Sequence, residues 1–229
     1  MVPLSLNTRG VGNVTIVRCS GRIVGGGETE SLREHITTLR QDHSAFVLHL
    51  SDVAFIDSSG LGTLVRLLTS TRRAGGDLKL CNVPEAVSKV LKITNLVTLF
   101  DTHESEEEAV SAFYRRHATR ERGAVAGPSV LCVDQSADVL AYLRELLRNA
   151  GYEVLTNSNL RDSLILIRAT RPSLTILGPN LTASPGTQQA FRTACATLPV
   201  VELGNEFSTL DAGQAASELL EKIRARLHS

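Results

Sequence analysis

An α/β protein with two compact units is the fold class that the sequence predicts. The 229-residue chain exceeds the usual length of one domain and favours two units of roughly 100 residues each. In both halves, short apolar runs alternate with helical patterns, which is typical of sheets covered by helices. Residues 116–128 (RHATRERGAVAGP) carry charge, Gly, Ala and Pro without apolar periodicity. We therefore expect a linker there, between domains at residues 3–115 and 129–229.

The first domain is expected to contain a mixed sheet. Residues 14–17 predict one strand, and residues 45–50 (AFVLHL) predict a second that is covered on both faces. Between them, Ser31-Leu32-Arg33-Glu34 matches a capping box, so we expect a helix that begins at Ser31. The elements expected further along are a helix from near Ser59 to Ala74, a strand at 78–81, a helix at 84–91, a short strand near Leu99 and Phe100, and a helix at 104–114.

The second domain follows a strict alternation of strands and helices, which predicts a doubly wound parallel sheet. The last helix repeats apolar residues at helical spacing, and such a stripe packs on a core more often than it meets a partner. The strands are expected at residues 129–133, 152–155, 174–177 and 200–203, and the helices at 137–150, 160–169, 187–197 and 212–227.

Composition excludes several classes of function. The 24 basic and 24 acidic residues balance, and neither half carries a basic face, so we expect no direct binding of nucleic acid and no attraction to acidic membranes. No apolar run approaches the length of about 20 residues that spans a bilayer, and we place the protein in the cytoplasm. The cysteines stand singly without metal-ligand spacing, which predicts reduced, buried thiols and no metal site; they are Cys19, Cys81, Cys132 and Cys195.

A strand-to-helix junction around Ser58 is the main candidate site. The strand ends at Phe55 and Ile56, and the helix begins near Ser59, so the hydroxyls lie where backbone N–H groups point outward. The helix dipole would stabilise a phosphate there by about 0.3 to 1 kcal/mol. Gly60 is expected to let the backbone of another protein approach closely. The alternative is that Asp57 or Ser58 only caps the helix, and the residues alone leave both interpretations open.

Residues 3–115 resemble a STAS domain, the fold of the anti-sigma factor antagonists. The segment Asp57-Ser58-Ser59-Gly60-Leu61-Gly62 matches the phosphorylation motif of that family, Asp-Ser-[Ser/Thr]-Gly-Leu-Gly, at every position. The resemblance implies a bacterial regulator that acts on transcription indirectly and has Ser58 as its phosphate acceptor, with Ser59 as the fallback.

The same resemblance implies a cycle of partners. The unphosphorylated protein binds an anti-sigma factor, which is a serine kinase, and so frees a sigma factor. Phosphorylation of Ser58 ends the binding, and a phosphatase resets the protein. The exposed face of the helix, with Thr63, Arg66 and Thr69, is either part of this interface or an ordinary solvated face. The complete set of residues expected to bind the partner is Asp57, Ser58, Ser59, Gly60, Leu61, Thr63 and Arg66.

The beginning of the second domain resembles a response-regulator receiver domain. The resemblance rests on Val130-Leu131-Cys132-Val133-Asp134, the amphipathic helix that follows, and Gly151-Tyr152-Glu153-Val154. It implies a flavodoxin-like fold, here with a shortened end because only 25 residues follow Gly204 in the 229-residue chain.

The receiver chemistry is expected to be lost. A receiver needs two adjacent acids for Mg²⁺, an Asp acceptor and a hydroxyl at successive strand ends. Only Asp134 remains, because Gln135 stands beside it, Gly178 is at the acceptor position and Gly204 is at the hydroxyl position. We expect an inactive pseudo-receiver used for binding or homo-oligomerisation. The acids Asp138 and Asp162 are expected on solvated helix surfaces.

Other features give no sign of catalysis. Gly25-Gly26-Gly27 fits neither GxxxxGK nor GxGxxG and predicts a flexible turn before the Ser31 cap. His49, in an apolar strand, is expected to be a satisfied, half-buried residue. No motif assembles a nucleophile, a base and an oxyanion site, so we expect neither enzymatic activity nor a cofactor. The alternative function is a scaffold or sensing module that binds its partner without phosphorylation.

Overall fold

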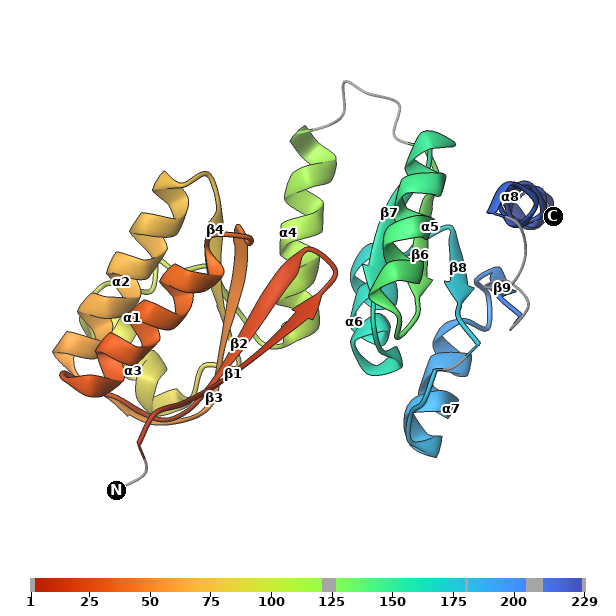
Figure 1. Ribbon diagram of the computed structural model, residues 1–229. Helices are drawn as coiled ribbons and strands as arrows, with labels where there is room; N and C mark the ends of the chain where they lie inside the picture. Colours follow the sequence, from red (N-terminus) through yellow and green to blue (C-terminus); the bar gives the residue numbers. More distant parts are fainter. Residues whose placement is uncertain (1–2, 121–126, 180, 205–211, 228–229) are drawn as a thin grey trace. The chain divides into compact units, whose positions relative to one another are not determined.

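The computed structural model describes residues 3–120, 127–179, 181–204 and 212–227. The chain divides into two compact units between Phe113 and Tyr114. Each unit contains one sheet and its own helices (Figure 1). In the described residues, no helix is both long and apolar enough to cross a lipid bilayer.

The first unit is a mixed five-stranded sheet in the order β1-β2-β3-β4-β5. Strand β1 pairs antiparallel with β2, and the other neighbours are parallel. Helices α1, α2 and α3 cover one face and α4 the other (Figure 1). The strands are β1 (Ser5–Val11), β2 (Val14–Ile23), β3 (Ala45–Ile56), β4 (Asp77–Cys81) and β5 (Thr102–His103), and the helices are α1 (Gly27–Leu39), α2 (Ser58–Arg73), α3 (Glu85–Ile93) and α4 (Glu106–Arg120).

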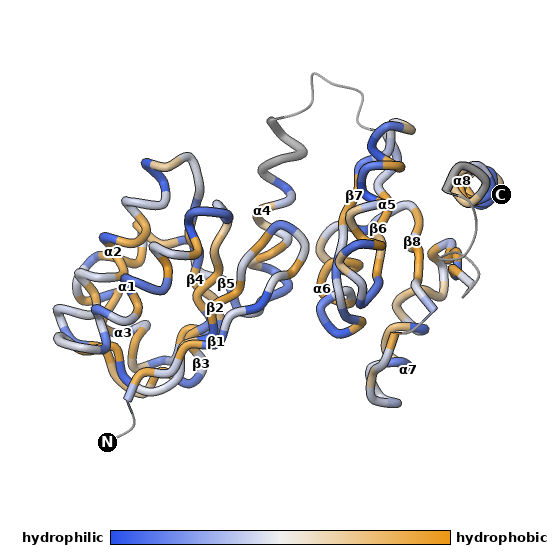
Figure 2. Tube along the Cα trace, in the orientation of Figure 1, coloured by the Kyte–Doolittle hydropathy of each residue, from blue (hydrophilic) through white to orange (hydrophobic). Residues whose placement is uncertain are grey.

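The second unit is a four-stranded parallel sheet in the order β7-β6-β8-β9, which confirms the prediction of a parallel sheet. The central strands β6 and β8 are mostly hydrophobic (Figure 2), as expected for strands covered on both faces. The strands are β6 (Ser129–Val133), β7 (Glu153–Asn157), β8 (Leu174–Leu177) and β9 (Val200–Glu202), and the helices are α5 (Ala137–Asn149), α6 (Leu160–Thr170), α7 (Pro185–Ala194) and α8 (Ala212–Leu227).

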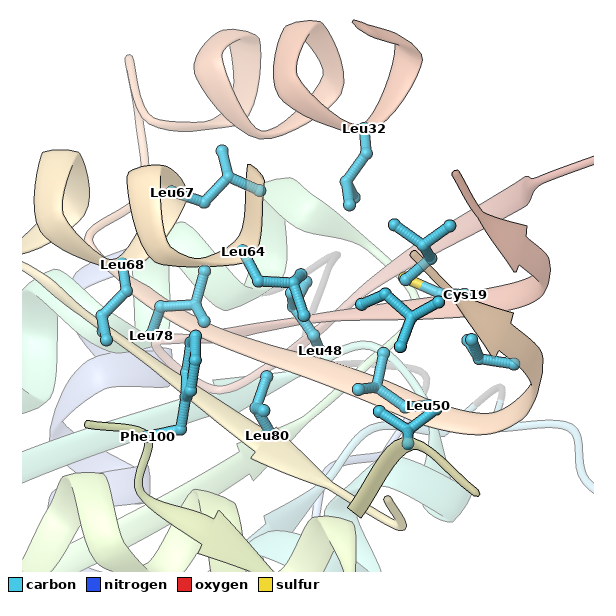
Figure 3. Packing of buried hydrophobic residues seen from close by; sticks show 14 of the residues in the cluster. Cys19, Leu32, Leu48, Leu50, Leu64, Leu67, Leu68, Leu78, Leu80 and Phe100 are labelled. Carbon is cyan, nitrogen blue, oxygen red and sulfur yellow. The ribbon is translucent and has the colours of Figure 1, made fainter. Parts of the chain in front are cut away.

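The core of the first unit lies between the sheet and helices α1 to α3. Leucines of α2 point toward Leu48 of β3 and toward Leu78 and Leu80 of β4 (Figure 3). On the opposite face of β4, Lys79 is 1% exposed. Its ammonium pairs with Asp101 and lies 4.9 Å from the centre of the Phe113 ring in α4. Because α2 is covered by α1 as well as by the sheet, only a narrow strip of α2 reaches solvent.

Helix α1 begins at Gly27, so the predicted capping box at Ser31 is wrong. Gly26 occupies the N-cap position with φ 108°, a conformation that glycine adopts without a steric penalty. The Thr29 hydroxyl donates to the Gly26 carbonyl at 3.0 Å, and Glu28 and Glu30 lie in the first turn, where the helix dipole favours acids. The helix therefore has a start signal one turn before the one that the capping-box pattern indicates.

Other predicted boundaries of the first unit also differ from the structure, since the strands expected at residues 14–17 and 45–50 continue to Ile23 and Ile56. The strand expected near Leu99 and Phe100 is wrong, because β5 is Thr102–His103 and Phe100 is buried in the core. Leu99 and Phe100 are therefore apolar because they lie in a turn that packs on the core, and not because they form a strand. Helix α4 continues to Arg120, so residues 116–120 of the predicted linker are helical. Residues 121–126 lie outside the described residues.

The second unit follows its predicted elements closely. Ser136, Asn159 and Ser184 cap α5, α6 and α7 through their side chains. Leu219 and Ile223 of α8 are buried with the sheet residues, so the apolar stripe of α8 packs on the core. Asp138 is exposed, but the expectation for Asp162 is wrong, because it is 4% exposed. Its Oδ2 accepts from the amide of Asn159, the cap of its own helix, at 3.0 Å.

The burial of the four cysteines confirms the prediction from the sequence. All four cysteines are buried, free thiols, and burial raises the pKa of Cys19 to about 12. His49 is 7% exposed, and desolvation lowers its pKa. Its Nε2 lies 3.9 Å from Oε1 of Glu106 in α4. The cysteines therefore serve as small apolar core residues.

Candidate functional site

Ser58 is the first residue of α2, as the strand-to-helix pattern predicts to within one residue. Strand β3 ends at Ile56, and Asp57 between the two elements is the N-cap, because its Oδ1 accepts from the Gly60 N–H at 2.7 Å. The side chains of Ser58 and Ser59 are exposed. Within the described part of the chain, the Ser58 hydroxyl has no hydrogen-bond partner. Asp57 therefore performs the capping, and the Ser58 hydroxyl is available to a partner.

A second backbone group holds the Asp57 carboxylate from the other side. The Gly25 N–H, in the turn between β2 and α1, donates to Asp57 Oδ2 at 2.9 Å. The hydrogen bonds from Gly25 and Gly60 lower the pKa of Asp57, because N–H donors stabilise the ionised carboxylate. Both oxygens of Asp57 thus point at backbone donors, which fixes a negative charge beside Ser58.

Gly60 has an internal role in the packing of α2 on the end of β2, beside the predicted role at the partner surface, which stays a prediction. A methyl group on its Cα would lie 2.1 Å from the Ile23 carbonyl oxygen and 2.8 Å from Cγ1 of Ile56. The first turn of α2 therefore sits directly on the end of β2, and only glycine fits there. Gly60 is buried, and these internal contacts are enough to explain a glycine at this position.

Leu61 and Thr63, which were also expected to bind the partner, are buried. Leu61 is 5% exposed and Thr63 is 2% exposed. Leu61 joins the core, while the Thr63 hydroxyl accepts from Arg66 Nη2 at 3.2 Å. The physical reason is the second cover on α2: helix α1 buries a flank that a helix packed on a sheet alone would expose. Arg66 and Thr69 are exposed, as expected.

The turn with three glycines belongs to this site, which the sequence interpretation missed. Gly25, Gly26 and Gly27 are exposed. A methyl group on Gly25 would lie 3.0 Å from Ser59 Oγ, so this turn passes directly over Ser59. The signal was present as three consecutive glycines, but their proximity to Ser59 depends on the pairing of β2 with β3.

An arginine and an aromatic ring lie on the two strands next to the junction. Arg22 of β2 pairs in register with Phe55 of β3, and its guanidinium lies 5.6 Å from the centre of the ring. Phe55 is 50% exposed. The positive charge of Arg22 also contributes to the lowered pKa of Asp57. An exposed aromatic side chain with a cation over its face is typical of binding surfaces.

In the second unit, the adjacent strands β6 and β8 bring Asp134 and Gly178 together. Asp134 is 7% exposed, and its Oδ1 accepts from the Ser136 N–H at 2.7 Å. A methyl group on Gly178 would lie 1.7 Å from Asp134 Oδ2. The carboxylate thus fills the space into which a side chain at position 178 would project.

The surroundings of Asp134 also differ from a metal site. Gln135 Nε2 donates to Thr182 Oγ1 at 2.8 Å, which links the loop after β6 to the loop after β8. Across the described ranges, no three His, Cys, Asp or Glu side chains are grouped so that they could hold a metal ion. The arrangement supports a structural role for Asp134.

Comparisons with known proteins identify the class of the first unit. The STAS domain family model matches residues 5–109, so the first unit is a STAS domain. The anti-sigma-B factor antagonist of Bacillus subtilis is 33% identical over 79 residues, which are 34% of this chain and 72% of that protein. The anti-sigma-B factor antagonist of Staphylococcus aureus is 30% identical over 88 residues, with 36% of this chain and 82% of that protein covered.

Among solved structures, the phosphorylated form of the Bacillus cell fate determinant SpoIIAA is similar, with 20% identity and a TM-score of 0.40 over 48% of this chain and 99% of that one. The two anti-sigma-B factor antagonists that match by sequence establish the family. This chain belongs to the STAS-domain anti-sigma factor antagonists.

Proposed function

We propose that this protein is an anti-sigma factor antagonist that is switched by phosphorylation of Ser58. The observation that carries the proposal is the exposed Ser58 hydroxyl at the start of α2, with the capping done by Asp57. Unphosphorylated protein would bind its anti-sigma factor kinase and free a sigma factor, and a phosphatase would reverse the modification. The protein would act in the cytoplasm, without catalytic activity or a cofactor of its own.

The chemistry at Ser58 is a phosphoryl transfer in which the kinase supplies the nucleoside triphosphate. The Ser58 Oγ attacks the γ-phosphorus, the bond from that phosphorus to the β–γ bridging oxygen breaks, and the nucleoside diphosphate leaves. The proton of the hydroxyl goes to a base of the kinase. The two carboxylate oxygens of Asp57 are already bonded to Gly25 and Gly60, so Asp57 is not oriented to take that proton.

The switch follows from charge. A phosphate on Ser58 adds a charge of about −1.5 to −2 at neutral pH, next to the ionised Asp57. The N-terminus of α2 stabilises this phosphate by about 0.3 to 1 kcal/mol, so the isolated domain tolerates it. In an interface that has been formed around a neutral hydroxyl, the same charge must be desolvated, and the partner is released.

Ser58 is preferred over Ser59 as the acceptor. Both side chains are exposed, but Ser59 Oγ lies under the turn at Gly25, at 3.0 Å from where a methyl group of that residue would be. The approach of a γ-phosphate to Ser59 is therefore restricted from that side. With Gly60, Leu61 and Thr63 buried, the exposed side chains of the expected partner surface on α2 are Ser58, Ser59 and Arg66, with Asp57 half-buried beside them.

The experiment incubates the protein with ATP and an anti-sigma factor kinase from the same organism, and measures intact mass. We expect one added phosphate, lost in Ser58→Ala and retained in the matched control Ser59→Ala. Ser58→Asp should lose binding of the kinase. Phosphate that persists in Ser58→Ala contradicts the assignment. Equal binding by the wild type, Ser58→Ala and Ser58→Asp would instead favour the scaffold function.

We infer further that residues 129–229 are a pseudo-receiver used for binding or homo-oligomerisation. The order β7-β6-β8-β9 corresponds to the first four strands of the flavodoxin-like order 2-1-3-4-5, and Asp134 fills the acceptor position at Gly178. Acetyl phosphate or beryllofluoride with Mg²⁺ should leave this unit unlabelled. A stable label on an Asp of residues 129–229 would overturn the inference.

A further inference from the structure

Helices α6 and α7 of the second unit lie side by side, and a groove with a volume of about 860 Å³ lies between the end of α6 and α7. We call it the α6–α7 groove. Small-molecule sites in proteins have volumes of about 300–1,000 Å³, so the groove is large enough to hold such a ligand. Its apolar lining consists of Ile167, Pro172, Ala190, Ala194 and Leu198.

The charged side chains of the α6–α7 groove have one sign. Arg168 in the last turn of α6 and Arg171 at its C-cap both line the groove, and none of the described Asp or Glu residues does. The other polar side chains that line it are neutral, and they belong to Gln189, Thr193 and Thr197. Guanidinium groups form paired hydrogen bonds with carboxylates and phosphates, so the groove is complementary to an anion.

Arg171 has a backbone conformation that arginine rarely adopts. It ends α6 with φ 48° and ψ 64°, where glycine is usual because it has no Cβ. The other described non-glycine residues with positive φ are Asn82 and Asn95, and asparagine tolerates this region better than most residues. The Arg171 side chain is exposed and forms no ion pair or hydrogen bond with the described residues. The fold therefore gives no reason for an arginine here, and strained residues of this kind cluster at ligand sites.

We propose that the α6–α7 groove binds a small amphipathic anion, whose head group contacts Arg168 and Arg171 and whose aliphatic chain lies on the apolar lining. The chain is aliphatic because no aromatic side chain is among the described residues that line the groove, so a ring system would have nothing on which to stack. The head group is a carboxylate or a phosphate, the two groups that match a guanidinium. The proposal goes beyond the switch at Ser58 and does not depend on it.

Isothermal titration calorimetry on the full chain tests the site with decanoate, decyl phosphate and decyltrimethylammonium as probes. We expect saturable binding of an anion, with one molecule per chain. Tighter binding of decanoate identifies a carboxylate as the preferred head group, and tighter binding of decyl phosphate identifies a phosphate. Decyltrimethylammonium has the same aliphatic chain with a positive head group, so it should bind at least roughly 10-fold more weakly than the preferred anion.

Variants of the arginines test the head-group contacts. Arg168→Gln and Arg171→Gln should each weaken binding of the preferred anion by roughly 10- to 100-fold, because each loses a charge-assisted hydrogen bond. Arg161→Gln is the matched control, since Arg161 is exposed on the same helix but does not line the groove, and it should bind like the wild type. Arg171→Gly should lose the same affinity and raise the melting temperature of the unliganded protein, because glycine adopts φ 48° without strain.

Gly186→Leu tests the aliphatic part of the site. Gly186 lines the groove, and a methyl group added to it would meet no atom within 4 Å, so the variant should fold and lose affinity for the anions because its side chain occupies part of the groove.

Circular dichroism establishes that each variant is folded. The site is overturned if neither anion binds, if the three probes bind equally, if folded Arg168→Gln and Arg171→Gln keep wild-type affinity, or if Arg161→Gln loses as much as they do. None of these measurements involves phosphate on Ser58, so a failure of the anion site is distinct from a failure of the proposed switch.

Discussion

Two strand-to-helix junctions of this molecule contain similar residues and present them in opposite ways. At the end of β3, Asp57 precedes Ser58, and at the end of β6, Asp134 is followed two residues later by Ser136. In the first junction the aspartate caps the helix, and the serine hydroxyl has no hydrogen-bond partner among the described residues. In the second, Ser136 is the cap of α5, and the aspartate is buried over Gly178.

The difference teaches that the backbone next to a strand end decides whether an acid there stays at the surface or is buried. Asp57 faces the Gly25 N–H, a donor from the adjacent strand connection, and stays at the surface. Asp134 faces a glycine on the adjacent strand, and its carboxylate turns into the vacant space. Ser136 is exposed as well, so what separates the two junctions is that its hydroxyl is used as the helix cap, whereas the hydroxyl of Ser58 is not.

Gly60→Ala tests the first junction and should have the largest effect. Its methyl group would lie 2.1 Å from the Ile23 carbonyl, so we expect the free energy of unfolding to fall by about 3 kcal/mol. Gly62→Ala is the matched control, because its methyl group meets no atom within 4 Å, and it should raise the stability by up to about 1 kcal/mol. Urea titration followed by circular dichroism measures both. Similar values for the two alanine variants would contradict the close approach of α2 to β2.

Gly178→Ala tests the second junction, with an expected loss of about 1–2 kcal/mol, because the Asp134 carboxylate must move away from its buried place. Asp134→Ala should cost about 1 kcal/mol for the lost hydrogen bond to the Ser136 N–H. In the double variant the Gly178→Ala cost should shrink, since the clash has been removed. A double-mutant cycle in urea measures this coupling. Strictly additive effects would show that Asp134 does not occupy the space at Gly178.

Asp57→Asn should have the smallest effect on stability, and its size should depend on pH. Backbone donors lower the folded-state pKa of Asp57, so the charged carboxylate contributes stability above its unfolded-state pKa of about 3.9. This contribution is lost as the pH falls through the lowered pKa. The difference in Tm between wild type and Asp57→Asn should therefore be constant near neutral pH and shrink below about pH 4. A difference that does not change with pH would argue against the paired carboxylate.

The elements that the sequence predicted best are those with their own start and stop signals. Helix α5 begins after the Ser136 cap and ends before Gly151, and α8 and β8 match their predicted bounds. Ser31 failed as a cap because a stronger signal, Gly26 followed by Glu28 and Glu30, lies just before it. A capping pattern therefore gives a helix start only when no earlier start competes with it.

The candidate site was predictable in part. The residues around Ser58 predicted the helix start, because it depends on residues that are adjacent in the chain, while the role of Ser58 as acceptor stays a proposal. The burial of Leu61 follows from its place beside Leu64 and Leu68 on the apolar face of α2, whereas the burial of Thr63 was not predictable, because threonine side chains are mostly exposed. The burial of Asp162 was likewise hidden, because an acid near a helix start is usually solvated.

The sequence by itself determined the alternation of strands and helices, the Ser58 motif and the presence of Gln135 and Gly178, which are not acids, at the ends of two strands. These depend on local periodicity, capping and residue identity. Only the tertiary structure decided that Gly25 holds Asp57 across 32 positions of the chain, that Gly60 is an internal contact, and that Asp134 fills the space at Gly178. The reason is physical: strand pairing sets which distant residues become neighbours, and those neighbours decide whether a polar side chain is exposed or buried.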